Sequence, residues 1–210
     1  MIEQHNFNSD LDFSVAAGDL ESELDSLQMS LDPALLQSVE VQTEPAEGRQ
    51  RRIFAKVQIP YSVEQVWQVL TDYESLADFI PNLAKSQRLE HPQDGIRIEQ
   101  VGTQRLLRIN FSARVVLDME EKFPNTIRFN MVEGDFKAFS GCWQLEPWLP
   151  VSSPETPVPD QPGTSLTYRV LVWPKRTMPV TIIERRLCSD LRLNLLAISQ
   201  RVDQLFGPSL

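Results

Sequence analysis

Hydrophobic and polar residues alternate along most of the chain after Arg51, and this period-two pattern predicts β-strands with one buried face. The first such segment is "RRIFAKVQI", residues 51–59, which Pro60 ends. Further alternating segments follow between residues 83 and 173, separated by turn-forming Pro and Gly. Because each has one apolar and one polar face, we expect a curved antiparallel sheet with one side in water. The residues expected on its inner face include Ile53, Ala55, Val57, Ile59, Phe111, Ala113, Val115, Leu117, Ile127, Phe129, Met131, Phe139, Trp143, Leu145, Leu166, Tyr168, Val170 and Val172.

Two parts of the chain instead repeat hydrophobic residues every three or four positions, which predicts helices. The segment "YSVEQVWQVLTDYESLADFIPNL", residues 61–83, predicts a helix at 63–71 with Ser62 as its N-cap and a second, short helix at 74–79. Near the C-terminus, residues 182–206 contain no Pro or Gly and predict a helix about 37 Å long. Its apolar stripe is Ile183, Leu187, Leu191, Leu195, Ile198, Val202 and Leu205.

The expected order of elements is one strand, two short helices, a run of antiparallel strands and a long last helix, which is an α+β fold. A sheet with one apolar face must cover that face, and only the last helix is long enough to do so. A bent sheet that closes on a single helix can leave a pocket between them. The same inner-face residues would also build a filled core, so the pattern alone leaves both arrangements open.

Residues 1–48 differ from the rest because they hold 11 of the 29 acidic side chains and no Lys or Arg. This composition predicts a largely disordered extension. Within it, Leu20, Leu24, Leu27 and Leu31 recur at helical spacing, so residues 19–32 are expected to be able to form an amphipathic helix. Two interpretations stay open: a solvated acidic tail, or a helix that docks on a protein partner or on the protein's own body.

The remaining 18 acidic and 20 basic side chains give residues 49–210 a formal charge of +2. A nearly neutral body argues against a dedicated nucleic-acid binder. Two cysteines, Cys142 and Cys188, do not make a disulfide framework, and the simplest expectation is a reduced, cytoplasmic protein. The proline-rich segment 147–163 is expected to be an exposed loop that joins two neighbouring strands.

Residues that could carry out catalysis are few. The two histidines, His5 and His91, have no Cys, His or paired carboxylate at metal-ligand spacing, so we expect no metal, no cofactor and no catalytic residue. Asn194 lies close to the stripe of the last helix and could orient a ligand oxygen, or could bond to a neighbouring group. Tyr168 could place a hydroxyl on the inner face of the sheet, although a buried tyrosine usually has a structural partner.

A basic cluster consists of Lys175, Arg176, Arg185 and Arg186, at the start of the last helix, with apolar residues between the charges. Two interpretations are open for it. It could contact an anionic membrane surface, which would make the protein peripheral to a membrane, or the acidic extension. It could equally be an ordinary charged helix start.

The segment "VEQVWQVLTDYESLADFIPNL" resembles a signature of the START-related superfamily of polyketide cyclase/dehydrase and lipid transport proteins, also called SRPBCC. Within it, the segment resembles the signature of the coenzyme-Q-binding branch, and "RLCSDLRLNLLAI" is similar to the C-terminal helix of bacterial and plastid-type members. The resemblance covers residues 51–206. It implies a helix-grip fold, in which a curved antiparallel sheet wraps around the long C-terminal helix, and an internal cavity for an apolar ligand. The residues expected to line that cavity are Phe79, Ile80, Phe111, Phe129, Met131, Trp143, Tyr168, Leu191, Asn194 and Leu195.

The leading hypothesis is therefore a non-enzymatic carrier of a hydrophobic small molecule, such as a lipid, an isoprenoid quinone or a pigment precursor. One alternative is an enzyme of the aromatase/cyclase type, which would need convergent polar groups in the cavity. Another is a protein-interaction module that works through the acidic extension.

Overall fold

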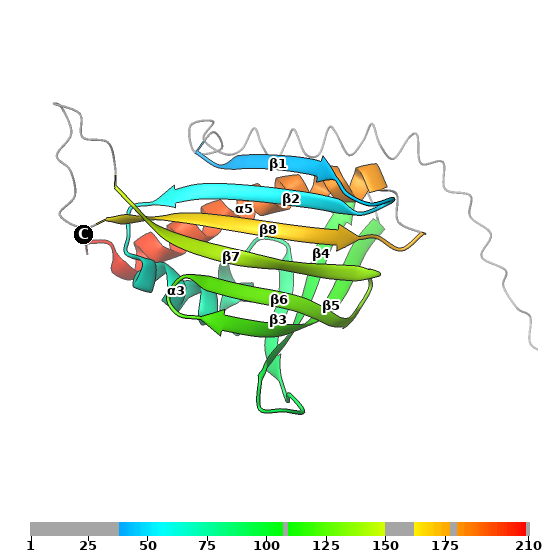
Figure 1. Cartoon of the computed structure of the whole chain (residues 1–210), viewed down its shortest axis with the longest axis horizontal. Coiled ribbons are helices and arrows are strands. Elements are labelled where there is room, and N and C mark those ends of the chain that lie inside the picture. The colour runs from blue at the N-terminus through cyan, green and yellow to red at the C-terminus, as the bar shows by residue number, and fades with distance from the viewer. Residues whose placement is uncertain (1–37, 107–108, 150–161, 177–179, 209–210) are drawn as a thin grey trace, which may run out of the picture.

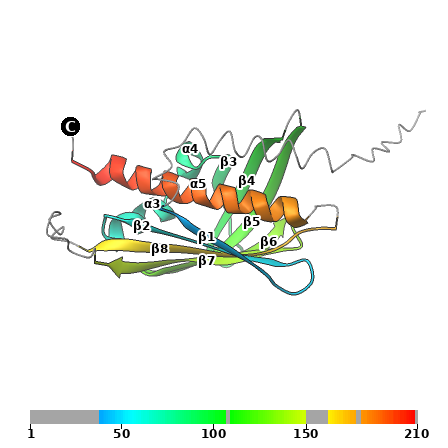
Figure 2. The same cartoon turned by 90° about the horizontal axis from the view of Figure 1, so that it is seen from above.

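The computed structural model describes residues 38–106, 109–149, 162–176 and 180–208. These residues form one curved, eight-stranded antiparallel sheet in the order β1-β2-β8-β7-β6-β5-β4-β3, with a long helix, α5, across one face (Figures 1 and 2). Two short helices, α3 and α4, connect β2 to β3. The strands are β1 (Glu40–Pro45), β2 (Arg51–Ile59), β3 (Leu83–Leu89), β4 (Ile96–Leu106), β5 (Ile109–Lys122), β6 (Thr126–Gly134), β7 (Ala138–Trp148) and β8 (Gly163–Trp173); the helices are α3 (Val63–Thr71), α4 (Leu76–Phe79) and α5 (Val180–Phe206).

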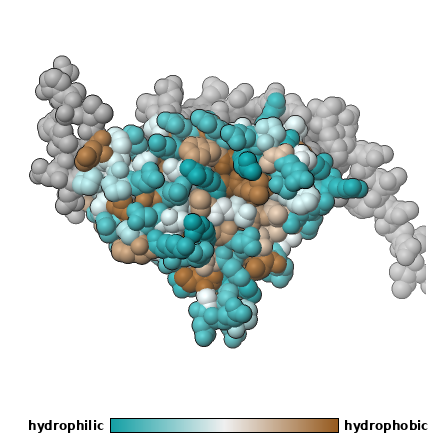
Figure 3. Space-filling model, in the orientation of Figure 1, coloured by the Kyte–Doolittle hydropathy of each residue, from teal (hydrophilic) through white to brown (hydrophobic). Residues whose placement is uncertain are grey.

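The predicted α+β helix-grip architecture is confirmed, because the sheet curves around α5 and the two short helices follow β2. Alternate residues of the central strands are buried as expected: Ile53, Ala55, Val57 and Ile59 on β2 are at most 3% exposed. The opposite face of the sheet is predominantly hydrophilic, with only small hydrophobic patches (Figure 3). One wet face and one covered face are what the period-two pattern predicts.

The helix α3 begins where its sequence predicts. The hydroxyl of Ser62 accepts a hydrogen bond from the backbone N–H of Gln65, and the Gln65 side chain accepts one from the N–H of Ser62. This reciprocal capping box satisfies two of the N–H groups that a helix start leaves free. Trp67, which lies on the apolar stripe of this helix, is buried in the core.

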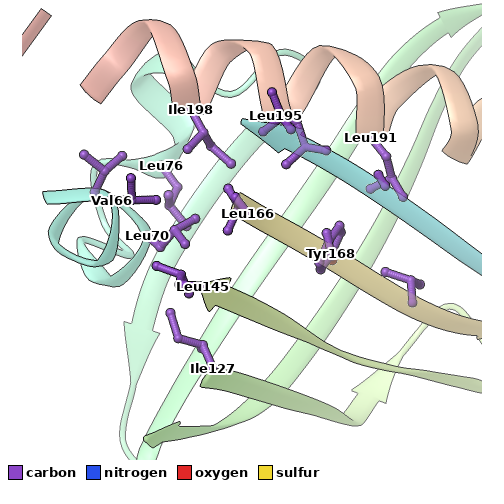
Figure 4. Packing of buried hydrophobic residues seen from close by; sticks show 14 of the residues in the cluster. Val66, Leu70, Leu76, Ile127, Leu145, Leu166, Tyr168, Leu191, Leu195 and Ile198 are labelled. Carbon is purple, nitrogen blue, oxygen red and sulfur yellow. The ribbon is translucent and has the colours of Figure 1, made fainter. Parts of the chain in front are cut away.

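Half of the interior is a filled core. The C-terminal half of α5 packs Leu195, Ile198 and Val202 against the sheet and α3, and each of these three side chains is at most 1% exposed. Figure 4 shows Leu195 and Ile198 pointing toward Leu166 on β8, with the α3 side chains beside them. The tight packing at this end fixes the distance between helix and sheet along the rest of α5.

Several boundaries differ from the sequence-based expectations. Residues 40–45, which lie in the acidic extension, form the edge strand β1, because their backbone pairs with β2 from Glu40↔Lys56 to Pro45↔Arg51. Residues 105–123 contain no Pro or Gly that would signal a turn, yet they form the end of β4 and the whole of β5, which pair as antiparallel neighbours. The second short helix covers only Leu76–Phe79. Leu205, which was expected in the stripe of the last helix, is half-exposed at 50%, whereas the next residue, Phe206, packs against the core.

The loop expected at 147–163 can be compared with the structure only in part. The strands β7 and β8 are antiparallel neighbours along their whole length, which agrees with a loop between them. Most of that loop, like the possible helix at 19–32, lies outside the described residues. Among the helices that the structure describes, none is both long enough and apolar enough to span a lipid bilayer.

Candidate functional site

The N-terminal half of α5 contacts β1 and β2 through Glu184, and it covers a cavity of about 240 Å³. The walls are the inner faces of β4 to β8, the cavity-facing side of α5, and the segment that links α3 to β3. Most of the lining side chains are aliphatic or aromatic. They are Leu70, Tyr73, Leu76, Ile80, Pro81, Leu83, Ile98, Ala113, Val115, Leu117, Met119, Ile127, Phe129, Phe136, Phe139, Trp143, Tyr168, Ile183, Leu187, Leu191 and Ile198, with the polar residues Asn82, Gln100, Arg186, Asp190 and Asn194 and the backbone of Gly102.

Aromatic rings from three adjacent strands make one wall of the cavity. Trp143 on β7 stacks on Tyr168 on β8, with ring centroids 3.7 Å apart and planes 11° from parallel. Phe129 on β6 lies 5.7 Å from Tyr168 and 5.4 Å from Phe139, centroid to centroid. Antiparallel pairing places these rings side by side, because Trp143 is the direct register partner of Tyr168. The wall is therefore a continuous apolar surface built by strand register.

The segment after α3 closes another side of the cavity. Tyr73 is 2% exposed, and its hydroxyl donates a hydrogen bond of 2.7 Å to Glu121 on β5. The backbone carbonyl of Tyr73 accepts a hydrogen bond from the Ser86 hydroxyl on β3. These two bonds hold the ring against the cavity. Burial, followed by the bond to Glu121, raises the pKa of the Tyr73 phenol, so this hydroxyl stays protonated and acts as a donor.

Polar side chains face the cavity mainly from α5. Arg186, Asp190 and Asn194 are spaced four residues apart and so lie on one face of the helix. The Nε of Arg186 is 3.6 Å from Oδ1 of Asp190, and the two side chains are 11% and 17% exposed. Asn82 donates a hydrogen bond of 3.3 Å to the same Asp190 oxygen. The cavity thus combines apolar walls with one polar stripe.

Six of the ten residues expected to line the cavity do so: Ile80, Phe129, Trp143, Tyr168, Leu191 and Asn194. Phe79 does not, because α4 turns its ring toward the C-terminal half of α5, where Arg201 Cζ lies 5.6 Å from the ring centroid. Leu195 is fully buried in the filled core. Met131 packs against the core, with its sulfur close to Gly134 at the end of β6. The side chain of Phe111 lies outside the described residues.

The sequence-based analysis missed Arg186 and Asp190 as cavity residues. A signal was present, because both lie four and eight residues before Asn194, which was singled out for its place near the apolar stripe. The sequence pattern placed Arg186 in one basic cluster with Lys175, Arg176 and Arg185. In the structure Lys175, Arg176 and Arg185 are exposed, whereas Arg186 turns into the cavity. Lys175 also donates a hydrogen bond to the carbonyl of Gly134, at 3.2 Å.

Cysteine, histidine and acidic side chains are the candidates for nucleophilic or metal-binding chemistry. Among the described residues, no group of three or more His, Cys, Asp or Glu could hold a metal ion. His91 lies in the β3–β4 turn, where its Nδ1 accepts hydrogen bonds from the backbone of Gln93 and Gly95. Cys142 and Cys188 are not disulfide-bonded. Burial, with Glu184 nearby, raises the pKa of the Cys188 thiol to about 11, which makes it a poor nucleophile.

The sequence and the fold were compared with known proteins. A family model described as "Polyketide cyclase / dehydrase and lipid transport" matches residues 59–196. A curated relative, the ribosome association toxin RatA of Escherichia coli, is 28% identical over 93 residues, which are 42% of this chain and 54% of the toxin. The chain therefore spans about half the length of this relative.

Solved structures with a similar fold include a lipid transfer protein and an aromatase/cyclase. A STAR-related lipid transfer protein from Xanthomonas axonopodis matches with a TM-score of 0.61 at 17% identity, over 80% of this chain and 95% of that one. The Zhui aromatase/cyclase from Streptomyces sp. R1128 matches with a TM-score of 0.56 at 15% identity, over 74% of this chain and 94% of that one. At these identities the likeness concerns the fold alone.

Proposed function

The chain belongs to the polyketide cyclase / dehydrase and lipid transport family, and on that premise we propose that its cavity binds a hydrophobic small molecule. The observation that carries this proposal is the space of about 240 Å³ between the aromatic wall and α5. Binding pockets are mostly apolar, with a few placed polar groups, and this cavity has that composition. Burial of ligand in it would contribute about 0.8 kcal/mol per methylene group.

The ligand that we propose has a compact ring or a short chain. An apolar cavity of about 150 Å³ holds a benzene ring, so this cavity has room for roughly two fused rings. Lipids, isoprenoid quinones and pigment precursors remain the proposed classes. For a quinone of the coenzyme Q type, the head group would fill the cavity and much of the isoprenoid chain would extend beyond it.

We propose a carrier function and not catalysis as the leading role. Among the described residues, the side chains that face the cavity include no cysteine, histidine or serine, and burial raises the pKa of the Tyr168 phenol and keeps it protonated. A carrier leaves its ligand unchanged. Mass spectrometry of organic extracts from the natively purified protein should therefore find an apolar compound near one equivalent, and should recover it intact after prolonged incubation. Extracts with no compound enriched over a control protein would contradict the proposal.

An aromatase/cyclase role is a second candidate, and one observation favours it. The pair formed by Arg186 and Asp190 places a donor and an acceptor together in an apolar space, where they could polarise a carbonyl group. A cyclase would convert a model poly-β-ketone thioester into a cyclised, dehydrated product that is one water lighter. Binding without any such product would favour the carrier.

We further propose a peripheral contact with an anionic membrane through Lys175, Arg176 and Arg185, in a cytoplasmic protein. These three exposed cations lie where β8 leads into α5, at the end of the helix that covers the cavity. Each close basic residue contributes about 1 kcal/mol at such a surface. Sedimentation with phosphatidylserine vesicles tests this: replacing all three by Gln should release the protein into the supernatant.

The segment 19–32 is proposed to form a helix that binds a protein partner or competes for the same three cations. Deleting residues 1–37 should then strengthen vesicle binding.

A further inference from the structure

The polar stripe on α5 contains two buried atoms without hydrogen-bond partners. Arg186 Nε and Asn194 Oδ1 are both inaccessible to solvent, and both residues face the cavity. Arg186 Nε lies 3.6 Å from Asp190 Oδ1, which is beyond hydrogen-bond distance. Buried polar atoms in folded proteins are nearly always paired, so each exception needs an explanation. Arg186 Nε–H is a donor that needs an acceptor, and Asn194 Oδ1 is an acceptor that needs a donor. A ligand in the cavity can supply both.

The charge of the cavity indicates which ligands it suits. Arg186 and Asp190 are the charged residues of its described lining, and they lie beside each other as an ion pair. Their charges cancel, so an ionised ligand would be buried without a net counter-charge, which is costly. A neutral ligand with a carbonyl oxygen accepts from Arg186 without that cost. A hydroxyl is a neutral group that can donate to Asn194.

The spacing of the two atoms adds a geometric requirement. Arg186 and Asn194 are eight residues apart, which is about 12 Å along a helix. Side chains on a helix lean in the same direction, so this separation is roughly kept at the side-chain level. One oxygen cannot satisfy both residues. The two polar groups of the ligand must therefore lie at opposite ends of a skeleton that faces the aromatic wall.

We propose that the ligand is a neutral, oxygenated ring compound that lies along α5, with a carbonyl oxygen at Arg186 and a hydroxyl group at Asn194. This inference rests on the proposed binding function and specifies its ligand class. Rings stack on the wall formed by Phe129, Trp143 and Tyr168, while the oxygens face the helix. Arg186 and Asn194 are then specificity-determining residues, and a simple hydrocarbon chain is not the preferred cargo.

Three naphthalene compounds distinguish the contribution of the carbonyl group to the affinity from that of the hydroxyl group. 2-Acetylnaphthalene carries a carbonyl group, 2-isopropenylnaphthalene has the same shape without oxygen, and 6-acetyl-2-naphthol adds a hydroxyl at the opposite end. Each competes with the fluorescent probe N-phenyl-1-naphthylamine, whose displacement gives an affinity. The quantity compared between proteins is the ratio of two affinities, which cancels differences in the stability of the variants and in the affinity for the probe.

In Arg186→Met, the preference for 2-acetylnaphthalene over 2-isopropenylnaphthalene should fall about tenfold or more, the size expected for a hydrogen bond from a charged donor. The matched control is Arg192→Met. Arg192 lies on the same helix and also has a buried Nε without a partner, but it does not line the cavity. Its replacement should leave the ratio unchanged. Asn194→Leu should lower the affinity for 6-acetyl-2-naphthol relative to 2-acetylnaphthalene, without disturbing the ion pair.

The outcomes distinguish the inference from the proposed function. If the probe and all three compounds bind but both ratios stay the same in Arg186→Met and Asn194→Leu, the polar stripe does not select the ligand and the inference is overturned. The inference would also be overturned if Arg192→Met lowered the preference for 2-acetylnaphthalene over 2-isopropenylnaphthalene as much as Arg186→Met does. If neither the probe nor any of the compounds binds the wild-type protein, the binding function itself fails.

Discussion

Asn82 Nδ2 donates a hydrogen bond to Asp190 Oδ1 across 3.3 Å, and this bond joins the segment after α4 to the last helix at the edge of the cavity. Asn82 has a φ of 62°, in the left-handed region where Asn is one of the few tolerated residues. Its backbone carbonyl accepts a hydrogen bond from Thr103 on β4. Asn82 thus connects three elements around the cavity.

Asn82→Gly should open this edge of the cavity without straining the backbone, because glycine adopts the same φ and lacks the amide. We expect association and dissociation of N-phenyl-1-naphthylamine to become several-fold faster, with a smaller change in affinity. Stopped-flow fluorescence measures both rates. The control is Asp94→Gly, which also removes a side chain at positive φ (55°) but in the β3–β4 turn. Unchanged rates in Asn82→Gly would show that the bond does not limit entry.

Gly141 is a position where the sheet tolerates no side chain. A Cβ atom there would lie 2.1 Å from the Arg169 carbonyl oxygen and 2.6 Å from Phe129 Cζ. Gly141→Ala should therefore lower the free energy of unfolding by about 1–3 kcal/mol and push Phe129 into the cavity. Urea titration measures the first effect. Gly102→Ala, where the nearest atom would be 3.7 Å away, should cost far less; equal losses in the two variants would contradict the steric explanation.

The sequence predicts the fold well because the period-two and period-3.6 patterns are strong and the caps are local. Ser62 and Pro60 mark a helix start and a strand end by chemistry that acts within a few residues. The sequence could not predict that Leu195 lies in the filled core while Leu191 lines a cavity, because both are buried leucines of one stripe. Only the curvature of the sheet separates a filled core from a cavity.

The polar half of the site was the hardest part to predict. Asn194 could be identified as a candidate because it interrupts an apolar stripe. Arg186 was grouped with the other three basic residues of its cluster. Which of these arginines turns inward depends on the rotation of α5, which its packing on β1, β2 and α3 sets. Thr43 and Arg51 both donate hydrogen bonds to the Glu184 carboxylate, and these bonds fix the same rotation of α5. They join residues that are more than 130 positions apart in the sequence.

Glu184 anchors the start of α5 to β1 and β2. The hydrogen bond from Thr43, together with the Arg51 guanidinium, lowers the pKa of the Glu184 carboxyl group below its ordinary value of 4.5. A carboxylate with a lowered pKa contributes stability above about pH 4.5, and loses it as the pH falls through the folded-state pKa. Glu184→Gln should therefore cost about 1 kcal/mol at pH 7 and less at pH 3.

Denaturant titrations at both pH values test this difference, with Glu146→Gln, at an exposed position on β7, as the control. A Glu184→Gln penalty that is the same at pH 7 and pH 3 would show that the anchor does not depend on the charge.

Cys188 should react slowly with thiol reagents. Burial, and then Glu184, raises its pKa to about 11, so at pH 8 only about one thiol in a thousand is ionised. In a Cys142→Ser protein, which leaves Cys188 as the single cysteine, reaction with Ellman's reagent at pH 8 should be about a hundredfold slower than in the same protein unfolded in urea. Comparable rates would show that the thiol is neither shielded nor shifted.

The most direct test of the central claim is a titration with N-phenyl-1-naphthylamine, a probe that fluoresces in apolar surroundings. Leu191 lines the cavity and is 4% exposed, so Leu191→Trp should fill the space with an indole ring. Leu205→Trp makes the same replacement at a half-exposed position of the same helix, outside the cavity. We predict that the wild-type protein and Leu205→Trp bind one equivalent of probe with the same affinity. The affinity of Leu191→Trp for the probe should be at least tenfold lower, although circular dichroism should show that this variant is folded. Equal affinity in all three proteins would mean that apolar ligands bind elsewhere, and that the space between α5 and the sheet is not the binding site.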